Sequence, residues 1–122
     1  MPDPKLMEAA VQAYFEGFRK HDLDIIISLF ADDATAEDPV GTPRHEGIQA
    51  VRAFYAQSIA TGAVLEPQGS TRIAADYAAF AFHAVVPDMG LVEVIDTFRF
   101  NEAGKIIEMR AFFGPGNVKM GA

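Results

Sequence analysis

The stretch that decides the fold lies late in the chain, where residues 91–100 read LVEVIDTFRF. Apolar and polar residues alternate along it, which is typical of a strand with one buried face, because side chains two positions apart share a face. Glu93 and Arg99 fall on one face and mark it as solvent-facing. Asp96 falls on the other face, with Val94 and Phe98. The sequence therefore predicts an aspartate that points into the apolar interior.

Burial of the Asp96 carboxyl group requires a physical explanation. An unpaired carboxylate inside a protein costs on the order of several kcal/mol. Keeping the proton is cheaper, and burial raises the pKa of the acid accordingly. A neutral carboxylic acid in an apolar site is a hydrogen-bond donor for a ligand oxygen. We therefore favour a functional role for Asp96 over a purely structural one.

The rest of the second half also has the composition of strands. Turn signals at residues 87–90 and 101–104 separate the candidates, and short connections favour antiparallel neighbours. The Gly-rich tail, residues 114–122, is expected to be irregular. The predicted strands are residues 63–68, 71–86, 91–100 and 105–113.

Helical spacing dominates the first half. Met7, Val11, Tyr14 and Phe18 recur at intervals of three and four, so Tyr14 lies on the buried side of a first helix. Asp22 is suited to cap a short second helix that ends at the polar residues 31–34. A third helix is expected over residues 48–59, with Tyr55 on its inner face. Helices followed by a meander of strands are typical of an α+β domain, and residues 1–122 suit a single one.

Composition excludes several classes of function. The chain has 17 acidic and 10 basic residues, a net charge of −7 and no basic cluster, so nucleic acid is not an expected partner. It has no cysteine and three dispersed histidines, so we expect no metal site. No secretory signal and no apolar run of about 18 residues is visible, so we expect a cytoplasmic protein without a membrane partner.

Two further polar residues stand out against apolar surroundings. Asp38 lies in a loop before Pro39, where an aspartate is also common as part of a turn. Tyr14 is compatible with a core tyrosine whose hydroxyl is satisfied. Taken singly, neither residue indicates chemistry. A turn residue remains an open interpretation for Asp38, and a core residue for Tyr14.

Several segments resemble bacterial ketosteroid isomerases. The segment FADDATAEDP, residues 30–39, is similar to the one that carries their catalytic aspartate, and VIDTFRF, residues 94–100, to the strand with their second acid. Tyr14 stands at the matching distance upstream, and residues 53–55 and 109–113 match as well. The resemblance spans residues 8–113. The ADDAT-like part is shared by the nuclear-transport-factor-2-like (SnoaL-like) superfamily, whereas the combination of Tyr14, Asp38 and Asp96 is more specific.

The resemblance implies a fold, a partner and an activity. The fold is a cone-shaped, strongly curved mixed sheet with three helices from the N-terminal half enclosing an apolar pocket, in a homodimer. The activity is a steroid delta-isomerase, which converts 3-oxo-Δ5-steroids to 3-oxo-Δ4-steroids without metal or cofactor. Asp38 would be the ionised general base, and Tyr14 and protonated Asp96 would form the oxyanion hole. Tyr55 would support Tyr14, although Phe30 stands where many relatives have another tyrosine.

A flat apolar substrate would need apolar walls, although each candidate is equally compatible with a role in the core. The candidates are Phe18, Phe54, Phe80, Phe82, Met109 and Phe113. Two other classes of function remain. One is a different enzyme on the same fold: a polyketide cyclase, which uses an Asp–His pair such as Asp38 and His83, or an epoxide hydrolase, which uses an Asp–Arg–Asp set. The other is a non-catalytic small-molecule-binding module.

Overall fold

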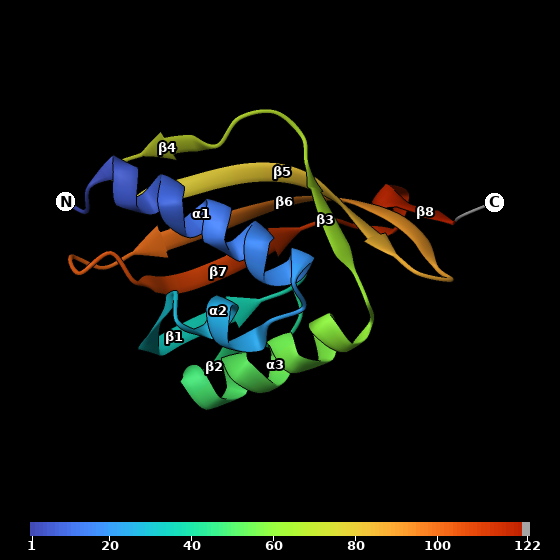
Figure 1. Ribbon diagram of the computed structural model, residues 1–122, viewed down its shortest axis with the longest axis horizontal. Coiled ribbons are helices and arrows are strands. Elements are labelled where there is room, and N and C mark those ends of the chain that lie inside the picture. The colour runs from blue at the N-terminus through green and yellow to red at the C-terminus, as the bar shows by residue number, and fades with distance from the viewer. Residues whose placement is uncertain (121–122) are drawn as a thin grey trace.

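The computed structural model describes residues 1–120, which form three helices packed against one side of a curved sheet (Figure 1). The helices are α1 (Pro4–Arg19), α2 (Leu23–Ile27) and α3 (Ile48–Ala60). The strands are β1 (Phe30–Glu37), β2 (His45–Glu46), β3 (Val64–Pro67), β4 (Arg72–Ala74), β5 (Tyr77–Val86), β6 (Gly90–Phe100), β7 (Ile106–Phe112) and β8 (Val118–Met120), and the short 3-10 helix η1 (Pro115–Asn117) precedes β8. This architecture confirms the predicted α+β class.

The sheet is mixed because the order of its strands differs from their order in the chain. The strand order is β2-β1-β7-β6-β5-β3, with β4 paired to β5 and β8 paired to β6. The pairing of β1 with β7 is parallel and the others are antiparallel. The first strand of the chain therefore lies directly beside β7, and the loop after β1 is brought next to the centre of the sheet.

Local sequence explains where the helices begin. The side chain of Asp3 accepts a hydrogen bond from the Lys5 N–H at 2.8 Å, and Asp22 caps α2 by accepting from Asp24 N–H at 3.0 Å. The apolar stripe of α1 then packs onto the sheet, with Met7 and Val11 fully buried. The predicted helices at the start of the chain, near Asp22 and over residues 48–59 are confirmed.

The structure corrects three boundaries. Residues 31–34 do not simply end a helix, because β1 already begins at Phe30 and buries Ala34 and Ala36 in alternation. Residues 71–86 form two strands rather than one, since the chain turns at Ala75, whose φ is 54°. The tail contains η1 and β8 within the described residues, where we had expected irregular chain. Its last two residues, 121 and 122, lie outside the described part.

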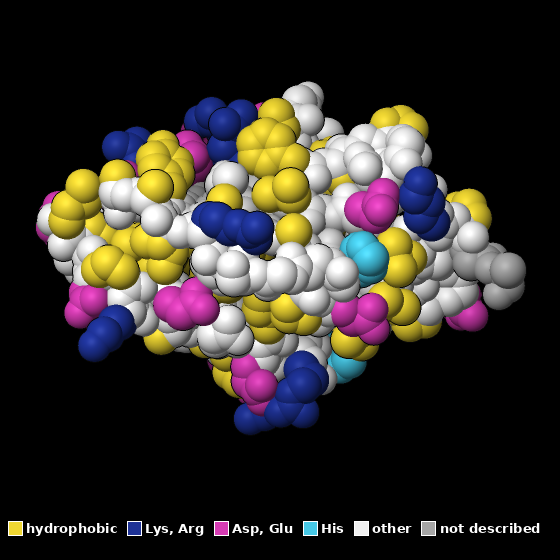
Figure 2. Space-filling model, turned by 90° about the horizontal axis from the view of Figure 1, so that it is seen from above, with side chains coloured by type: hydrophobic (Ala, Val, Ile, Leu, Met, Phe, Trp, Pro, Cys, Tyr) yellow, Lys and Arg dark blue, Asp and Glu magenta, His cyan; other side chains and the backbone are white. Residues whose placement is uncertain are grey.

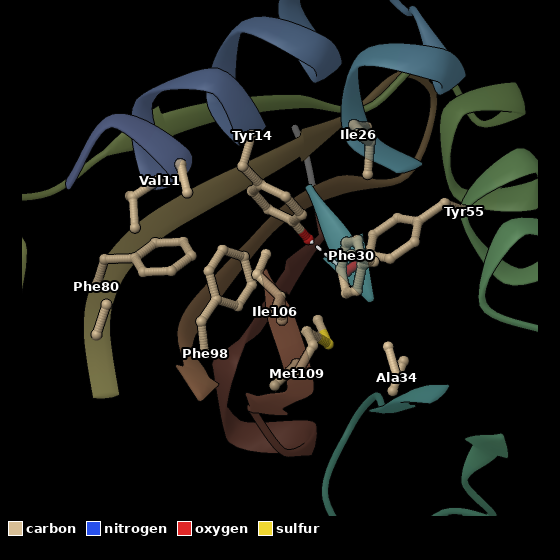
Figure 3. Packing of buried hydrophobic residues seen from close by; sticks show 14 of the residues in the cluster. Val11, Tyr14, Ile26, Phe30, Ala34, Tyr55, Phe80, Phe98, Ile106 and Met109 are labelled. Atoms are coloured by element: carbon tan, nitrogen blue, oxygen red, sulfur yellow. Dashed lines mark hydrogen bonds between the residues drawn. The ribbon is translucent and has the colours of Figure 1, made fainter. Parts of the chain in front are cut away.

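The core lies between the helices and the inner face of the sheet. Figure 3 shows the side chain of Tyr14 descending from α1 toward Phe98 on β6, with Tyr55 approaching from α3. The ring centroids of Tyr14 and Phe98 are 5.0 Å apart in an edge-to-face arrangement. The aromatic core therefore surrounds the two tyrosine hydroxyls, which are the polar groups in its middle.

A candidate active site in the apolar cavity

Asp96 lies where the alternation in the sequence predicted. On the opposite face of β6, Ile95 and Arg99 are exposed, whereas Asp96 is 1% exposed. In the sheet it stands between Phe80 of β5 and Ala111 of β7, both of which are buried. The prediction of an inward-pointing acid is therefore confirmed by the register of three adjacent strands.

The Asp96 carboxyl is unsatisfied within the protein. Neither of its oxygens has a hydrogen-bond partner among residues 1–120. Burial raises the pKa of Asp96 well above its ordinary value, the negative charge of Asp38 raises it further, and the nearby Tyr14 hydroxyl opposes the shift. These effects favour the neutral acid, and its proton has no acceptor among the described residues.

Tyr14 and Tyr55 bring two hydroxyl groups to the cavity that Asp96 also lines. Their oxygens are 3.0 Å apart and share one hydrogen bond, drawn as a dashed line in Figure 3. Burial raises the pKa of both phenols well above 10, so both are protonated at neutral pH. Two protons and one shared bond leave one hydroxyl proton free, and when Tyr55 donates to Tyr14 that free proton is on Tyr14.

Asp38 approaches the same cavity from the loop that follows β1. Ala36 and Asp38 fall on the inner side of this segment, whereas Glu37 between them falls on the outer side, as alternation requires. The Asp38 side chain is only partly buried, and burial raises its pKa to about 6. This carboxyl is therefore ionised at neutral pH, in contrast to Asp96.

An apolar cavity of about 210 Å³ brings these groups together. Tyr14, Asp38, Tyr55 and Asp96 all line it, and so do the candidate wall residues Phe18, Phe82 and Phe113. The remaining lining residues are Ser58, Thr61, Ala63, Leu65, Ala84, Val86, Val92 and Val94. The two carboxyl and two phenol groups thus face a space whose remaining lining is mostly hydrocarbon.

The other three candidate wall residues lie outside this lining. Phe80 pairs with Asp96 across β5 and β6 and packs against Phe98, with ring centroids 4.9 Å apart. Met109 pairs with Phe98, two residues beyond Asp96 along β6, and is buried. Phe54 packs against His45, with ring centroids 4.8 Å apart. Their size suggested that they line the cavity, but in the structure their side chains pack elsewhere.

Several lining residues had no place in our sequence-based candidate list because they are small or aliphatic. Ala84 and Val86 continue the inner face of β5 beyond Phe82, and Val92 continues that of β6 beyond Val94. The period-two alternation that identified Asp96 could have found them. Ser58 follows Tyr55 by one helical turn, so the helical period could have found it too.

The arrangement does not match the other residue sets that the sequence left open. His83 pairs with Glu93 across β5 and β6, on the face of the sheet opposite to the cavity. Within the lining given above there is no histidine and no arginine. Among residues 1–120, no group of His, Cys, Asp or Glu side chains is suited to hold a metal ion. No helix in that range is long and apolar enough to cross a membrane.

The cavity is suited to proton transfer next to a carbonyl group. An ionised acid can remove a proton, and two neutral donors can stabilise negative charge that develops on an oxygen. A low-polarity environment strengthens these interactions because little water competes for them. Such a site would act on an apolar molecule that carries a carbonyl group.

Comparison with known proteins defines the class. The model of the SnoaL-like domain matches residues 11–109, and the chain belongs to this family, whose members share the nuclear-transport-factor-2-like fold. The chain is also 37% identical over 116 residues to a steroid delta-isomerase of Nocardioides simplex, covering 92% of this chain and 93% of the relative. The resemblance to ketosteroid isomerases of this superfamily, inferred from the sequence, is thereby confirmed.

A solved structure gives a second point of comparison. It is that of SalBIII, an epoxide hydrolase/cyclase-like enzyme with a role in pyran ring formation in the polyether salinomycin. The two chains are 28% identical, the TM-score is 0.91, and the match covers 99% of this chain and 100% of the other. The fold is therefore shared by enzymes that act on different small molecules.

Proposed function

We propose that the protein is a steroid delta-isomerase that converts 3-oxo-Δ5-steroids to 3-oxo-Δ4-steroids. The observation that carries this proposal is the contrast between the two aspartates in one apolar cavity: burial raises the pKa of Asp38 only to about 6, whereas the pKa of Asp96 is raised well above its ordinary value. One acid is thus suited to be a base and the other to be a donor. The 37% identity to a steroid delta-isomerase supports the same activity.

In this mechanism Asp38 is the general base. Its carboxylate removes a proton from carbon 4, beside the 3-oxo group, and the electron pair of that C–H bond moves toward the carbonyl oxygen to give a dienolate. The same carboxyl, now protonated, returns the proton to carbon 6, and the double bond comes into conjugation with the ketone. A base whose pKa is close to the operating pH favours both halves of this transfer.

Tyr14 and Asp96 would stabilise the dienolate oxygen. Each donates a hydrogen bond that strengthens as negative charge develops, and a donor of this kind contributes about 3–4 kcal/mol to lowering the barrier. The unpartnered carboxyl of Asp96 supports this role, because a bound oxygen would satisfy a group that the protein leaves unsatisfied. Tyr55 would orient Tyr14 through their shared hydrogen bond.

The shape of the cavity supports a flat and largely apolar substrate. From Asp96 the inner face of β6 continues through Val94 to Val92, four residues away, which corresponds to about 13 Å of strand. Phe18, Phe82 and Phe113 would contact the rings along this path. The 3-oxo group would lie at the inner end, beside Tyr14 and Asp96.

An epoxide hydrolase or cyclase is the alternative, and the similarity to SalBIII is the observation that favours it. A carboxyl pair can in principle serve epoxide chemistry, in which one acid protonates the epoxide oxygen and another group activates the nucleophile. The lining of this cavity offers neither an arginine nor a histidine beside the acids, and most of it is hydrocarbon. These features favour enolisation over the activation of water.

We also propose that the enzyme is a homodimer formed through the outer face of the sheet. Ile95, Phe112 and Tyr77 are large side chains on this face and are 49%, 41% and 40% exposed. Ile95 and Phe112 are paired across β6 and β7, so their exposed side chains lie side by side on this face. A second copy of the chain would cover it.

An ultraviolet assay with 5-androstene-3,17-dione tests the proposed activity, because only the product is a conjugated enone. We expect the purified protein to form the enone, and Asp38→Asn to lose about 10²–10⁴ in rate while still binding a phenolic steroid such as equilenin. The absence of enone formation by the unaltered protein would reject the isomerase. Full activity of Asp38→Asn would reject Asp38 as its base.

A further inference from the structure

The loop that carries Asp38 is held by the residue just before it. Glu37 ends β1, and its side chain is 13% exposed on the outer face of the sheet. Its Oε2 accepts a hydrogen bond from the Gly41 N–H at 2.9 Å, across the loop. Its Oε1 accepts one from Arg110 Nε at 3.2 Å, on β7. One carboxylate thus joins the end of a strand, the loop and the neighbouring strand.

The strand β7 connects this junction to the second acid of the cavity. Glu37 pairs with Arg110 in the parallel β1–β7 register, and Ala111, the next residue, pairs with Asp96 in the β6–β7 register. The Val40 N–H donates to the Ala111 carbonyl at 2.8 Å. Two consecutive residues of β7 therefore set where the loop lies relative to Asp96.

Asp38 itself has little to hold its side chain. No hydrogen bond to the Asp38 carboxyl is formed among residues 1–120, and burial is the one cause of its raised pKa. Glu37, in contrast, is fixed in its ionised form: the Gly41 hydrogen bond lowers its pKa, and the Arg110 guanidinium lowers it further. The position of Asp38 must therefore come from its backbone.

We propose that Glu37 is a positioning residue, whose contacts with Gly41 and Arg110 hold the Asp38 loop at the distance from Asp96 that proton transfer requires. This inference rests on the proposed isomerase activity. Reacting groups must be placed closely, and an error of about 1 Å can cost up to about 100-fold in rate. Glu37 faces away from the cavity and would not touch the substrate, so it would affect turnover rather than binding.

The kinetic test compares Glu37→Ala with Glu37→Gln. We expect the alanine variant to lose about 10–100-fold in kcat with KM nearly unchanged. The glutamine variant should lose less activity than the alanine variant, because its single amide oxygen can still accept one of the two hydrogen bonds, from Gly41 or from Arg110. Asp76→Ala is the matched control, since it removes an ion pair to Arg99, 3.1 Å long, from another part of the sheet. Wild-type kcat in a folded Glu37→Ala protein would overturn the proposal.

A second readout is independent of turnover. Nuclear magnetic resonance of the carboxyl carbons gives the titration midpoint of Asp38 in the unaltered protein and in Glu37→Ala. We expect the midpoint to fall from about 6 toward the ordinary value of about 3.9, because a loosened loop admits water. An unchanged midpoint would contradict the proposal.

These two measurements separate the inference from the activity on which it rests. If the unaltered protein forms no enone, the isomerase is rejected, and the titration alone decides whether Glu37 positions Asp38. If Glu37→Ala does not fold, Arg110→Gln removes the other side of the same ion pair and is measured in its place. A smaller fall in kcat and in the Asp38 midpoint is expected, because Gly41 and Arg44 still contact the Glu37 carboxylate. Wild-type values would again overturn the proposal.

Discussion

Two aspartates in one cavity differ because their surroundings differ. Asp38 lies at the end of a strand, where it is only partly buried, and its pKa is raised to about 6. Asp96 lies in the middle of a central strand, fully buried between two others, and its pKa is raised well above the usual range. The same side chain therefore supplies a base in one place and a neutral donor in the other.

Substitutions at Asp96 test the donor role. We expect Asp96→Asn to retain more isomerase activity than Asp96→Ala, because an amide still donates a hydrogen bond to the dienolate oxygen. The alanine variant should lose about 10²–10³ in kcat, the usual effect of removing one oxyanion donor. Steady-state kinetics with the same steroid gives both values. Equal losses in the two variants would argue against a donor at this position.

The pH profile tests the assignment of the base. Since Asp38 must be ionised to accept a proton, kcat/KM should rise with pH through about 6 and then level off. Burial raises the pKa values of both Asp96 and Tyr14 and so favours their neutral forms. A profile that is flat from pH 5 to pH 7, about one unit to either side of the Asp38 pKa, would be incompatible with this base.

At the level of elements, α1 positions Tyr14 and depends on a glycine to approach α2. Gly17 lies one turn after Tyr14 and faces Ile26, which is fully buried. A Cβ atom on Gly17 would lie 2.6 Å from Ile26 Cγ1, closer than any normal contact. The two helices can therefore pack as they do because this position has no side chain.

Gly17→Ala is expected to destabilise the protein in spite of the higher helix propensity of alanine. Propensity contributes up to about 1 kcal/mol in favour of the variant. Overpacking against an immobile neighbour costs about 1–3 kcal/mol and should prevail. Denaturant unfolding measures the difference, with Gly116→Ala as the control because nothing lies within 4 Å of its Cβ position. An increased free energy of unfolding for Gly17→Ala would contradict the packing described here.

The elements also show what a sequence can and cannot predict. Asp96, Tyr14 and Tyr55 were placed correctly on inner faces because each lies in a long segment with a clear period. The start of β1 was missed because Asp32 and Asp33 are polar and exposed, in a strand whose register is irregular there. The extent of the cavity was not predictable, since it depends on which aromatic side chains turn into the core.

Glu37 illustrates the same limit at the candidate site. Its contact with Arg110 requires the parallel pairing of β1 and β7, since the two residues are 73 positions apart in sequence. No periodic pattern signals such a contact. In the sequence alone, Glu37 is one acid among 17.

At the scale of the whole molecule, the two faces of the sheet have different tasks. The inner face encloses the cavity, while the outer face exposes apolar side chains among its charges. The part of the surface seen in Figure 2 has basic and acidic side chains interspersed with hydrophobic ones and no extended basic area. This distribution agrees with the net charge of −7 and with an apolar rather than an anionic partner.

The proposed homodimer can be tested by sedimentation velocity. At micromolar concentration, we expect the molar mass obtained for the unaltered protein to be twice the 13.2 kDa of one chain. Ile95→Lys should shift it to the monomer, because a lysine in the middle of the apolar outer face would be costly to bury. Met89→Lys, in the turn between β5 and β6, is the control. A monomeric unaltered protein would reject the homodimer without affecting the site.

The measurement that tests this account most directly is the protonation state of Asp96 at neutral pH. Infrared difference spectroscopy between the unaltered protein and Asp96→Asn isolates the stretching band of this one carboxyl group. We expect the band of a neutral carboxylic acid at pH 7, lowered in frequency when a phenolic steroid binds and accepts its hydrogen bond. A carboxylate band at pH 7 would remove the donor from the cavity and contradict the account.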